Sequence, residues 1–238
     1  MGNGKYDKGC EIRETISTEF GILKPYYETE LGKLYHGDCL EIMPMLEPVD
    51  LVLTDPPYGV GKADWDAAFP SKTTWEVLKK ELTVGGNFLL IPGEKYLPEK
   101  IALISSMFDY QWVIPWYKPN AMQFGKTGYS KHSLIWWFSV GNPKERPKKM
   151  IDIIIVPMCL KGDTNINHPS PKPVSVIFEL LSNFTSNTTL DPFLGSGTTA
   201  IACERLNRRW IGIEIEEKYC EIAAKRIEKE NQQLKLFT

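Results

Sequence analysis

A doubly wound α/β fold with a mostly parallel sheet is predicted by three features of the sequence. Short apolar runs rich in β-forming residues alternate with stretches of helical periodicity, glycine and proline punctuate the ends of these runs, and no internal repeat interrupts the alternation. Such alternation is typical of parallel sheets covered by helices on both faces. The 238 residues are enough for one sizeable core, or for one core with a small inserted lobe.

The first half of the chain is predicted to form an arm followed by alternating strands and helices. Residues 1–30 show no strong periodicity and are expected to form the arm. The strand expected at 50–54 must end before Pro56 and Pro57, because two prolines cannot continue a central strand. Strands are expected at 32–36, 50–54, 87–91 and 111–117, and helices at 40–46, 75–82 and 97–108.

The second half resumes the alternation after an irregular segment. Residues 119–163 contain glycines, prolines and two apolar runs, and are expected to form strands and loops outside the βα pattern. The main domain is therefore expected to comprise residues 31–118 and 164–238. Its later elements are expected to be helices at 174–182, 198–206 and 217–232, and strands at 189–193 and 210–215.

The charge distribution is uneven although the formal net charge is only -2. Residues 118–149 contain seven basic residues and one acidic residue, which gives this segment a formal charge of +6. Such a patch favours phosphate binding more than net charge does, although a solvated surface loop is the plain alternative. The basic residues are Lys118, Lys126, Lys131, Lys144, Arg146, Lys148 and Lys149.

The sequence predicts a cytoplasmic protein without a metal site. Its five cysteines lack zinc-ligand spacing, its three histidines are scattered, and no apolar run reaches the roughly 20 residues of a membrane span. The N-terminus also lacks the apolar stretch of a signal peptide. Cys203, Cys220, Trp136 and Trp137 are expected to be packing residues of the core.

A glycine turn between a predicted strand and a predicted helix is a candidate ligand site. It runs from Asp191 to Thr199, and Gly195 and Gly197 would let the backbone approach a ligand closely. The helix that begins at Thr198 offers free N–H groups to the carboxylate of an amino-acid-like cofactor. Glu214 follows Gly197 by 17 residues, where an acidic residue reaches ribose hydroxyls in nucleotide-binding α/β folds. A structural turn and a surface carboxylate are the alternatives.

The corner Asp55-Pro56-Pro57-Tyr58 is a candidate catalytic site at the carboxyl end of a strand. An aromatic amino group is a poor nucleophile because its lone pair is delocalised into the ring. The Asp55 carboxylate and the Pro56 carbonyl could each accept a hydrogen bond from this amino group and free its lone pair for an electrophilic methyl group. The two prolines fix the backbone of the corner. The alternative is a proline-rich turn with a partly buried tyrosine.

The aromatic ring of Tyr58 suits a base that has left its duplex. A stacked base cannot reach such a corner, and unstacking costs a few kcal/mol. Stacking on an aromatic side chain returns roughly 1–3 kcal/mol. Catalysis would then depend on orientation and electrostatics rather than on a strong general base.

These motifs resemble the amino-methylating DNA methyltransferases, which pair a D-P-P-Y corner with an F-x-G-x-G turn. The corner precedes the turn, as in the circularly permuted β group, whose target-recognition segment lies between them; here that segment is 119–163. Residues 34–41, 168–174 and 210–214 resemble further motifs of the group, and 116–120 resembles a base-pocket motif more loosely. The pattern departs from the group at Pro171, where glutamine is common, and in the short segment of about 45 residues, which is small for a recognition domain.

The resemblance implies a Rossmann-like fold, S-adenosylmethionine as the cofactor, DNA as the partner and adenine N6 as the target. It places Asp38 near the cofactor's adenine and Lys172 near its methionine end. It leaves dimerisation and a restriction endonuclease partner open. The expected catalytic residues are Asp55, Pro56, Pro57 and Tyr58, and the expected cofactor-binding residues are Asp38, Cys39, Lys172, Asp191, Phe193, Gly195, Ser196, Gly197, Thr198 and Glu214.

Several alternatives remain at this level. Asp38 could instead cap the following helix, and Lys172 could be a surface lysine. Cytosine N4 is a second target, although in that subgroup serine usually stands where Asp55 does. RNA or protein amine methyltransferases usually carry their motifs in the reverse order. A non-catalytic nucleotide-binding or DNA-binding module would not need the intact corner. No Pro-Cys pair offers a thiol nucleophile for methylation of cytosine at C5.

Overall fold

The computed structural model describes residues 17–18, 21–59, 61, 68–93, 97–121, 123–125, 128–144, 147, 152–158 and 172–235. One large sheet contains the strands β3 (Tyr27–Glu28), β4 (Gly32–His36), β5 (Val49–Thr54), β6 (Leu82–Leu90), β7 (Asp109–Tyr117), β10 (His132–Ser139), β11 (Ile154–Ile155), β12 (Thr188–Asp191) and β13 (Arg209–Glu214). The helices are α1 (Cys39–Ile42), the 3-10 helix η1 (Met43–Met45), α2 (Lys72–Glu81), α3 (Leu97–Ser105), α4 (Val174–Asn183), α5 (Thr198–Arg205) and α6 (Glu217–Leu234). Two small hairpins pair β1 (Ser17–Thr18) with β2 (Gly21–Ile22) and β8 (Gln123–Gly125) with β9 (Gly128–Ser130).

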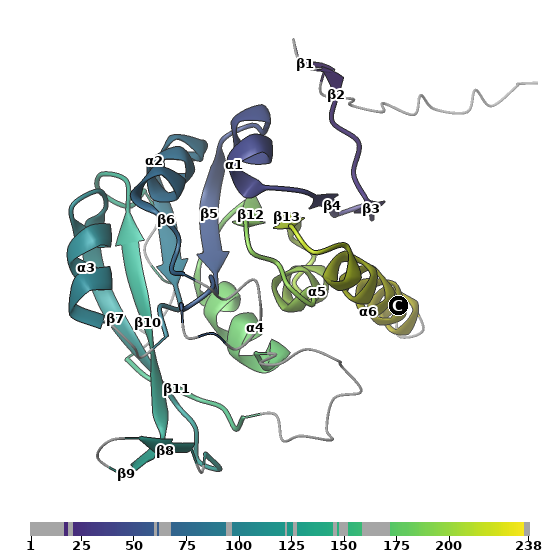
Figure 1. Ribbon diagram of the computed structural model, residues 1–238. Helices are drawn as coiled ribbons and strands as arrows, with labels where there is room; N and C mark the ends of the chain where they lie inside the picture. The colour runs from purple at the N-terminus through teal and green to yellow at the C-terminus, as the bar shows by residue number, and fades with distance from the viewer. Residues whose placement is uncertain are drawn as a thin grey trace, which may run out of the picture.

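The strand order explains where a ligand site can form. The large sheet runs β11-β7-β10-β6-β5-β12-β13-β4-β3, and β6, β5, β12, β13 and β4 are mutually parallel (Figure 1). The chain leaves β5 toward β6 in one direction and leaves β12 toward β13 in the other. Ligands in open α/β sheets bind at the carboxyl ends of the strands where such a reversal occurs.

Helices cover both faces of the sheet, so the predicted doubly wound fold is confirmed (Figure 1). Side chains alternate along β5, so that Leu51 and Leu53 join a cluster with α4, α5 and α6, whereas Val52 joins a cluster with α1, α2 and α3. Leu51, Leu53 and Val52 are all at most 1% exposed, as expected for a strand buried on both faces.

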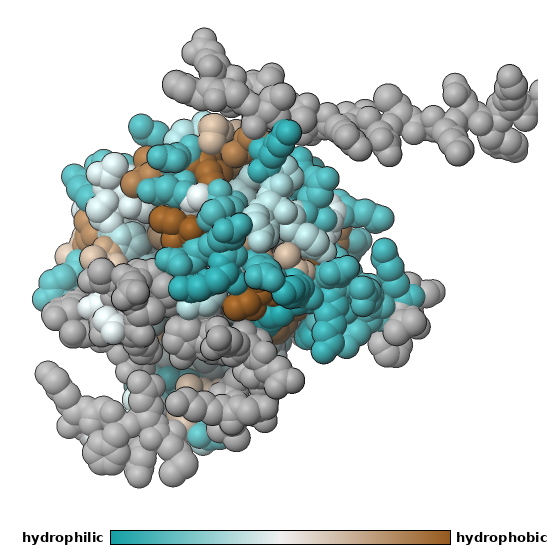
Figure 2. All heavy atoms as spheres, turned by 45° about the vertical axis from the view of Figure 1, so that its right-hand side comes forward, coloured by the Kyte–Doolittle hydropathy of each residue, from teal (hydrophilic) through white to brown (hydrophobic). Residues whose placement is uncertain are grey.

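The expected packing residues lie in these two clusters. Trp136, Cys203 and Cys220 are buried. Trp137 is partly buried and stacks edge-on against Phe184 at a centroid distance of 5.3 Å. On the face shown in Figure 2, hydrophobic side chains reach the surface only in small separate patches among hydrophilic ones. Within the described ranges, no helix combines the length and the hydropathy needed to cross a membrane.

Most predicted elements are present within a few residues, and the differences have physical causes. The helix expected at 40–46 is a short α-helix that tightens into a 3-10 turn at Pro44. Strand β6 begins at Leu82 and passes through the expected break at Gly85 and Gly86, where the β5–β6 register shifts. The run at 151–156 forms only the two-residue strand β11, and residue 151 lies outside the described residues.

The segment 119–163 is less separate from the main domain than expected. Strand β10 pairs antiparallel with both β6 and β7, so residues 132–139 belong to the main sheet. An antiparallel strand needs no crossover helix, which is why its run broke the βα rhythm without leaving the sheet. Among the other described residues of the segment, the β8–β9 hairpin lies outside the main sheet and β11 belongs to it, and the recognition role of the segment stays a prediction.

The basic patch is also smaller than the sequence indicated. Lys118 is only 3% exposed and donates to Ser133 Oγ at 2.9 Å, so it is unavailable to a surface ligand. Lys131 and Lys144 are exposed. The other basic residues of the patch, Lys126, Arg146, Lys148 and Lys149, lie outside the residues whose side chains are described.

The end of the expected arm is part of the sheet. Strand β3 pairs antiparallel with β4, and the Thr29 hydroxyl donates to Glu204 Oε1 at 2.6 Å. Glu204 also accepts from Trp210 Nε1 at 2.8 Å, so one buried carboxylate joins the edge turn to β13. This two-residue strand was too short to show a period in the sequence.

Close packing at this edge predicts a specific sensitivity to substitution. A Cβ atom at Gly32 would lie 2.3 Å from Trp210 Cδ2, and the buried indole has little room to move. We expect Gly32→Ala to lower the free energy of unfolding by about 1–3 kcal/mol, measured by thermal and urea denaturation. In a Trp210→Leu background the same substitution should cost less, and equal costs in both backgrounds would contradict the packing explanation.

Candidate active site

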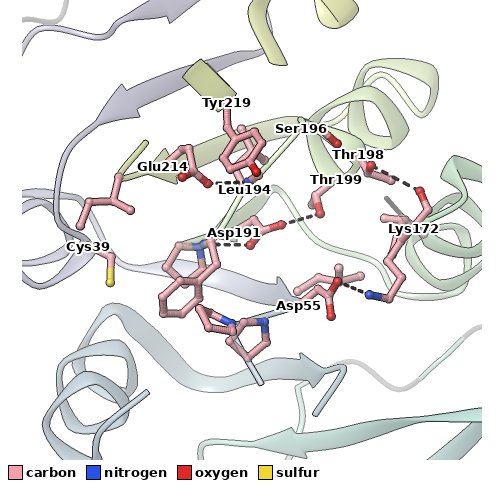
Figure 3. A pocket seen from close by; sticks show the side chains of 18 of the residues that line it. Cys39, Asp55, Lys172, Asp191, Leu194, Ser196, Thr198, Thr199, Glu214 and Tyr219 are labelled. Atoms are coloured by element: carbon pink, nitrogen blue, oxygen red, sulfur yellow. Dashed lines mark hydrogen bonds and ion pairs between the residues drawn. The ribbon is translucent and has the colours of Figure 1, made fainter. Parts of the chain in front are cut away.

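A cavity of about 260 Å³ opens at the carboxyl ends of β4, β5, β12 and β13, at the reversal point of the sheet (Figure 3). Most of its lining comes from the ends of these strands and the segments that follow them, and Lys172 and Ile177 come from α4 and the residues just before it. Of the fourteen residues expected in the site, thirteen line the cavity: Asp38, Cys39, Asp55, Pro56, Pro57, Tyr58, Lys172, Asp191, Phe193, Gly195, Ser196, Thr198 and Glu214.

Two expected features do not line the cavity, and a third lies outside the described residues. Gly197 does not line the cavity; it is the N-cap of α5 and adopts a left-handed conformation with φ of 84°. The motif at 168–174 is described only from Lys172 onward, so its first residue, His168, lies outside the described residues. Trp116 and Asn120 do not line the cavity either, and both hold the segment 156–158 through its backbone, at Val156 and Met158.

The glycine turn is held in place by Glu214 at the end of β13. One carboxylate oxygen accepts from Gly195 N at 2.8 Å and the other from Glu216 N at 2.9 Å. Glu214 is 8% exposed, which contradicts the alternative of a surface carboxylate, and burial raises the pKa of its carboxyl. Gly195 needs a left-handed φ of 55°, which glycine adopts without strain. Glu214 therefore shapes the turn and also presents its carboxylate to the cavity.

Asp191 joins the glycine turn to the strand that carries the candidate catalytic corner. It accepts from Thr54 Oγ1 at 2.8 Å, from Thr199 Oγ1 at 2.6 Å and from Phe193 N at 3.1 Å. Asp191 is 3% exposed, and this burial raises the pKa of its carboxyl from 3.8 to about 6. The three hydrogen bonds oppose that rise because they favour the charged form.

The corner at the end of β5 presents a partnered carboxylate. Asp55 forms an ion pair with Lys172 and accepts a hydrogen bond from the Tyr58 hydroxyl (Figure 3). The Lys172 ammonium also lies 3.1 Å from the Tyr58 hydroxyl and 5.3 Å from the centre of its ring. Lys172 is thus a partner of the corner and not a free surface lysine. The carboxylate oxygens of Asp55 therefore already act as hydrogen-bond acceptors toward an amine.

The opposite side of the cavity offers both polar and flat apolar surfaces. Asp38 Oδ1 accepts from Leu40 N at 2.8 Å, so the predicted alternative of a helix cap is correct, and the same residue also lines the cavity. Burial raises the pKa of the neighbouring Cys39 thiol to about 12, so this cysteine is inert. Tyr219 of α6 and the half-exposed Ile215 complete this wall.

Sequence reasoning missed Tyr219, Thr54 and Thr199 as site residues. Tyr219 lies in the first turn of an amphipathic helix, where an aromatic residue is usually interpreted as core. Thr54 is the last residue of a buried strand, and only the pairing of β5 with β12 brings it to Asp191. The sequence holds no local signal for a contact between residues 137 positions apart.

The arrangement can hold a cationic ligand with an amino-acid end and a flat ring. Four carboxylates and one ammonium line the cavity, which gives it an excess of negative charge. Among the described residues, no three potential metal ligands cluster together. The carboxylate of Asp55 and the ring of Tyr58 lie at one end, where a planar amine could be held against them.

Comparisons with known proteins agree with this geometry. A family model described as DNA methylase (N6_N4_Mtase) matches residues 49–225. The type II methyltransferase M2.DpnII of Streptococcus pneumoniae is 28% identical over 257 residues, which cover 89% of this chain and 96% of that protein.

Two solved structures share the fold. The M1.HpyAVI–SAM complex superposes with a TM-score of 0.68 at 24% identity and covers 83% of this chain and 99% of its own. The cytosine-N4-specific PvuII DNA methyltransferase also has a TM-score of 0.68, at 21% identity, and covers 88% of this chain and 93% of its own. Because the family model spans well over half of the 238 residues, from β5 into α6, the chain belongs to the DNA methylase family.

Proposed function

We propose that this protein transfers a methyl group from S-adenosylmethionine to N6 of an adenine that has flipped out of duplex DNA. The observation that carries the proposal is the Asp55 carboxylate, which lines the same cavity as the glycine turn and already binds an ammonium group. Membership of the DNA methylase family supports methyl transfer to DNA as the reaction, and the Asp55–Tyr58 corner supports an amino group as the target. Unstacking the base costs a few kcal/mol, which stacking against Tyr58 would partly offset.

The charge of the cavity fits S-adenosylmethionine, which supplies an electrophilic methyl group on a positively charged sulfur. The carboxylates of Asp38, Asp55, Asp191 and Glu214 surround a site whose only cation among the lining residues is Lys172. The turn at Phe193, Gly195, Ser196 and Thr198 would hold the amino-acid end, with Gly197 shaping the turn behind it. Glu214 would accept from the ribose hydroxyls, and Asp38 with Cys39 would border the adenine.

The corner would act by orienting the target amine. The Asp55 carboxylate and the Pro56 carbonyl would each accept one hydrogen bond from the amino group, so that its lone pair points toward the methyl donor. Pro57 would fix the backbone of the corner. The incoming amine would take the place that the Lys172 ammonium holds at Asp55, so one donor would replace another without leaving the carboxylate unpaired. The methylated amine becomes acidic and can release its proton without a strong base.

The identity of the first corner residue favours adenine over cytosine. In the cytosine-N4 subgroup the first corner residue is usually serine, whereas this chain has Asp55. The fold does not separate the two targets, because the cytosine-N4-specific PvuII enzyme has a similar architecture. Methylation of cytosine N4 is therefore the second candidate, and it would use the same cavity and the same cofactor.

The DNA contacts are proposed to come from the segment 119–163. Its β8–β9 hairpin follows β7 outside the main sheet, and the exposed Lys131 lies between this hairpin and β10, near the carboxyl end of β6. Lys144 is also exposed, but its N–H donates to Gly85 O near the start of β6, at the opposite end of the sheet, so only Lys131 is proposed as a contact. The similarity to M2.DpnII, a type II methyltransferase, supports a defined DNA site as the substrate. Phosphate contacts from such basic residues would position the DNA without reading its sequence.

Product analysis tests the target atom. The protein is incubated with tritiated S-adenosylmethionine and unmethylated genomic DNA, and the digested nucleosides are separated by chromatography. We expect label in N6-methyladenine. Label in N4-methylcytosine would keep the mechanism and contradict the proposed role of Asp55 in target choice. Cofactor binding without any labelled nucleoside would contradict the proposed substrate.

Removal of the Asp55 carboxylate should separate transfer from cofactor binding. We expect Asp55→Ala to lower the single-turnover transfer rate by about 10²- to 10³-fold, because the amine loses its charged acceptor. The dissociation constant for S-adenosylmethionine, measured by calorimetry, should change little.

A matched control lies at the other end of the same strand. Asp50 accepts from Asn187 N at 2.6 Å and from Thr188 N at 2.9 Å, and it does not line the cavity. Asp50→Ala removes a carboxylate from β5 and should leave the transfer rate near that of the native protein. If Asp55→Ala weakens cofactor binding and transfer to the same degree, Asp55 is structural and the proposal is wrong.

A further inference from the structure

A buried lysine lies directly behind the Asp55–Tyr58 corner. Lys100, on α3, is only 3% exposed and does not line the cavity. Lysine is among the residues least often buried, because an ammonium group loses its hydration in the interior. Its position therefore needs a physical reason, and its contacts supply one.

The Lys100 ammonium joins the segments that follow two neighbouring strands. It donates to the Pro92 carbonyl at 2.7 Å, beyond the end of β6, and to the Tyr58 carbonyl at 3.4 Å, beyond the end of β5. It also lies 5.4 Å from the centre of the Tyr58 ring and 4.7 Å from the centre of the Phe69 ring. Both distances are within the range of cation–π attraction. Lys100 thus contacts both the main chain and the ring of Tyr58.

The ring of Tyr58 is fixed from another side by Gly93. A Cβ atom at Gly93 would come within 2.7 Å of Tyr58 Cγ, so the ring packs against bare backbone at this point. Gly93 has a φ of 68°, which only glycine adopts readily. Because the Tyr58 hydroxyl also donates to Asp55, a movement of the ring would be transmitted to the carboxylate.

Lysine supplies a charged donor at this position that an apolar side chain of similar length would lack. Loss of the ammonium would leave the Pro92 and Tyr58 carbonyls without this donor, which is destabilising where the acceptor is buried. Methionine has an unbranched chain of nearly the same length as lysine and fills irregular gaps. The feature that methionine lacks is the ammonium, which contacts Pro92, Phe69 and Tyr58.

We infer that Lys100 is a positioning residue that holds Tyr58 in the place where the target base stacks. The inference rests on the proposed function, since it assigns the Tyr58 ring to the flipped base. Lys100 does not touch the reacting atoms. It acts through the carbonyl and the ring of Tyr58, and through them on Asp55. A misplacement of about 1 Å at such a corner can cost about 10²-fold in rate.

The first test compares Lys100 with an exposed lysine that has the same two kinds of partner, a main-chain carbonyl and an aromatic ring. Lys79 of α2 also donates to a main-chain carbonyl, that of Met107, and lies 6.0 Å from the centre of the Phe108 ring, but it is remote from the cavity. We expect Lys100→Met to lower kcat/KM for DNA about 10- to 100-fold, while Lys79→Met leaves it unchanged. The dissociation constant for S-adenosylmethionine should stay within about twofold of the native value for both, since neither lysine reaches the cavity.

The second test asks whether Lys100 acts through Tyr58. In a Tyr58→Leu background, Lys100→Met should cause little further loss in single-turnover transfer, because the ring that it positions is gone. Full additivity of the two losses would contradict the inference. So would native kcat/KM in Lys100→Met, or a loss of cofactor affinity equal to the loss of kcat/KM.

A second variant guards against a folding defect. If Lys100→Met does not fold, as judged by its melting temperature, Lys100→Gln replaces it, because it keeps an N–H donor but is shorter and neutral. It is expected to show the same loss of kcat/KM with native cofactor affinity, and native kcat/KM would overturn the inference. Failure of the proposed function is distinguishable, because the native protein itself would then yield no N6-methyladenine.

Discussion

Asp191 binds two threonines from different elements, and the cavity depends on this contact. Its carboxylate accepts from Thr54 at the end of β5 and from Thr199 on α5, and a third hydrogen bond comes from Phe193 N in the glycine turn. Parallel pairing brings the carboxyl ends of β5 and β12 together, and Asp191 fixes the distance between the segments that follow them. Without this bridge, only the pairing of β5 with β12 would set the separation of the corner and the turn.

This arrangement has an energetic cost. Burial raises the pKa of Asp191 from 3.8 to about 6. Near pH 7 the charged carboxylate therefore costs about 3 kcal/mol of folding free energy relative to the exposed group, since each pKa unit corresponds to about 1.4 kcal/mol. A neutral residue would avoid this cost. In the proposed function the negative charge is retained because the cofactor is a cation, and Glu214 contributes to the same field, whereas the charge of Asp55 is paired with Lys172.

Local motifs made much of the site predictable from the sequence. The corner at 55–58 and the turn at 191–199 are contiguous segments whose composition reflects their backbone geometry, through two prolines in one and two glycines in the other. The alternating pattern also predicted most strands and helices. It did not place the apolar run of β10 in the main sheet and gave no sign of β3, because an antiparallel strand without a crossover and a strand of two residues leave no βα signature.

The parts that escaped prediction are contacts between distant segments. Thr54 reaches Asp191 only because β5 and β12 are neighbours, and Lys100 reaches Tyr58 only because α3 packs behind β6 and β5. The burial of Lys118 could not be predicted from the run of basic residues either, because a count of charges does not show which side chains point into the core. Sequence patterns thus identified most of the residues that line the cavity, whereas tertiary structure identified the residues that hold them in place.

The most direct test of this account measures the stability and cofactor affinity of Asp191→Asn as a function of pH. Glu204→Gln, which alters a buried carboxylate outside the cavity, is the control for affinity. Because the folded-state pKa of Asp191 is raised, its stabilising contribution is present below pH 3.8 and is lost as the pH rises through about 6. The account predicts that the asparagine variant gains stability over the native protein across this interval, and binds S-adenosylmethionine at least about tenfold more weakly at pH 7.5. An equal melting temperature at every pH, or native affinity in the stabilised variant, would contradict it.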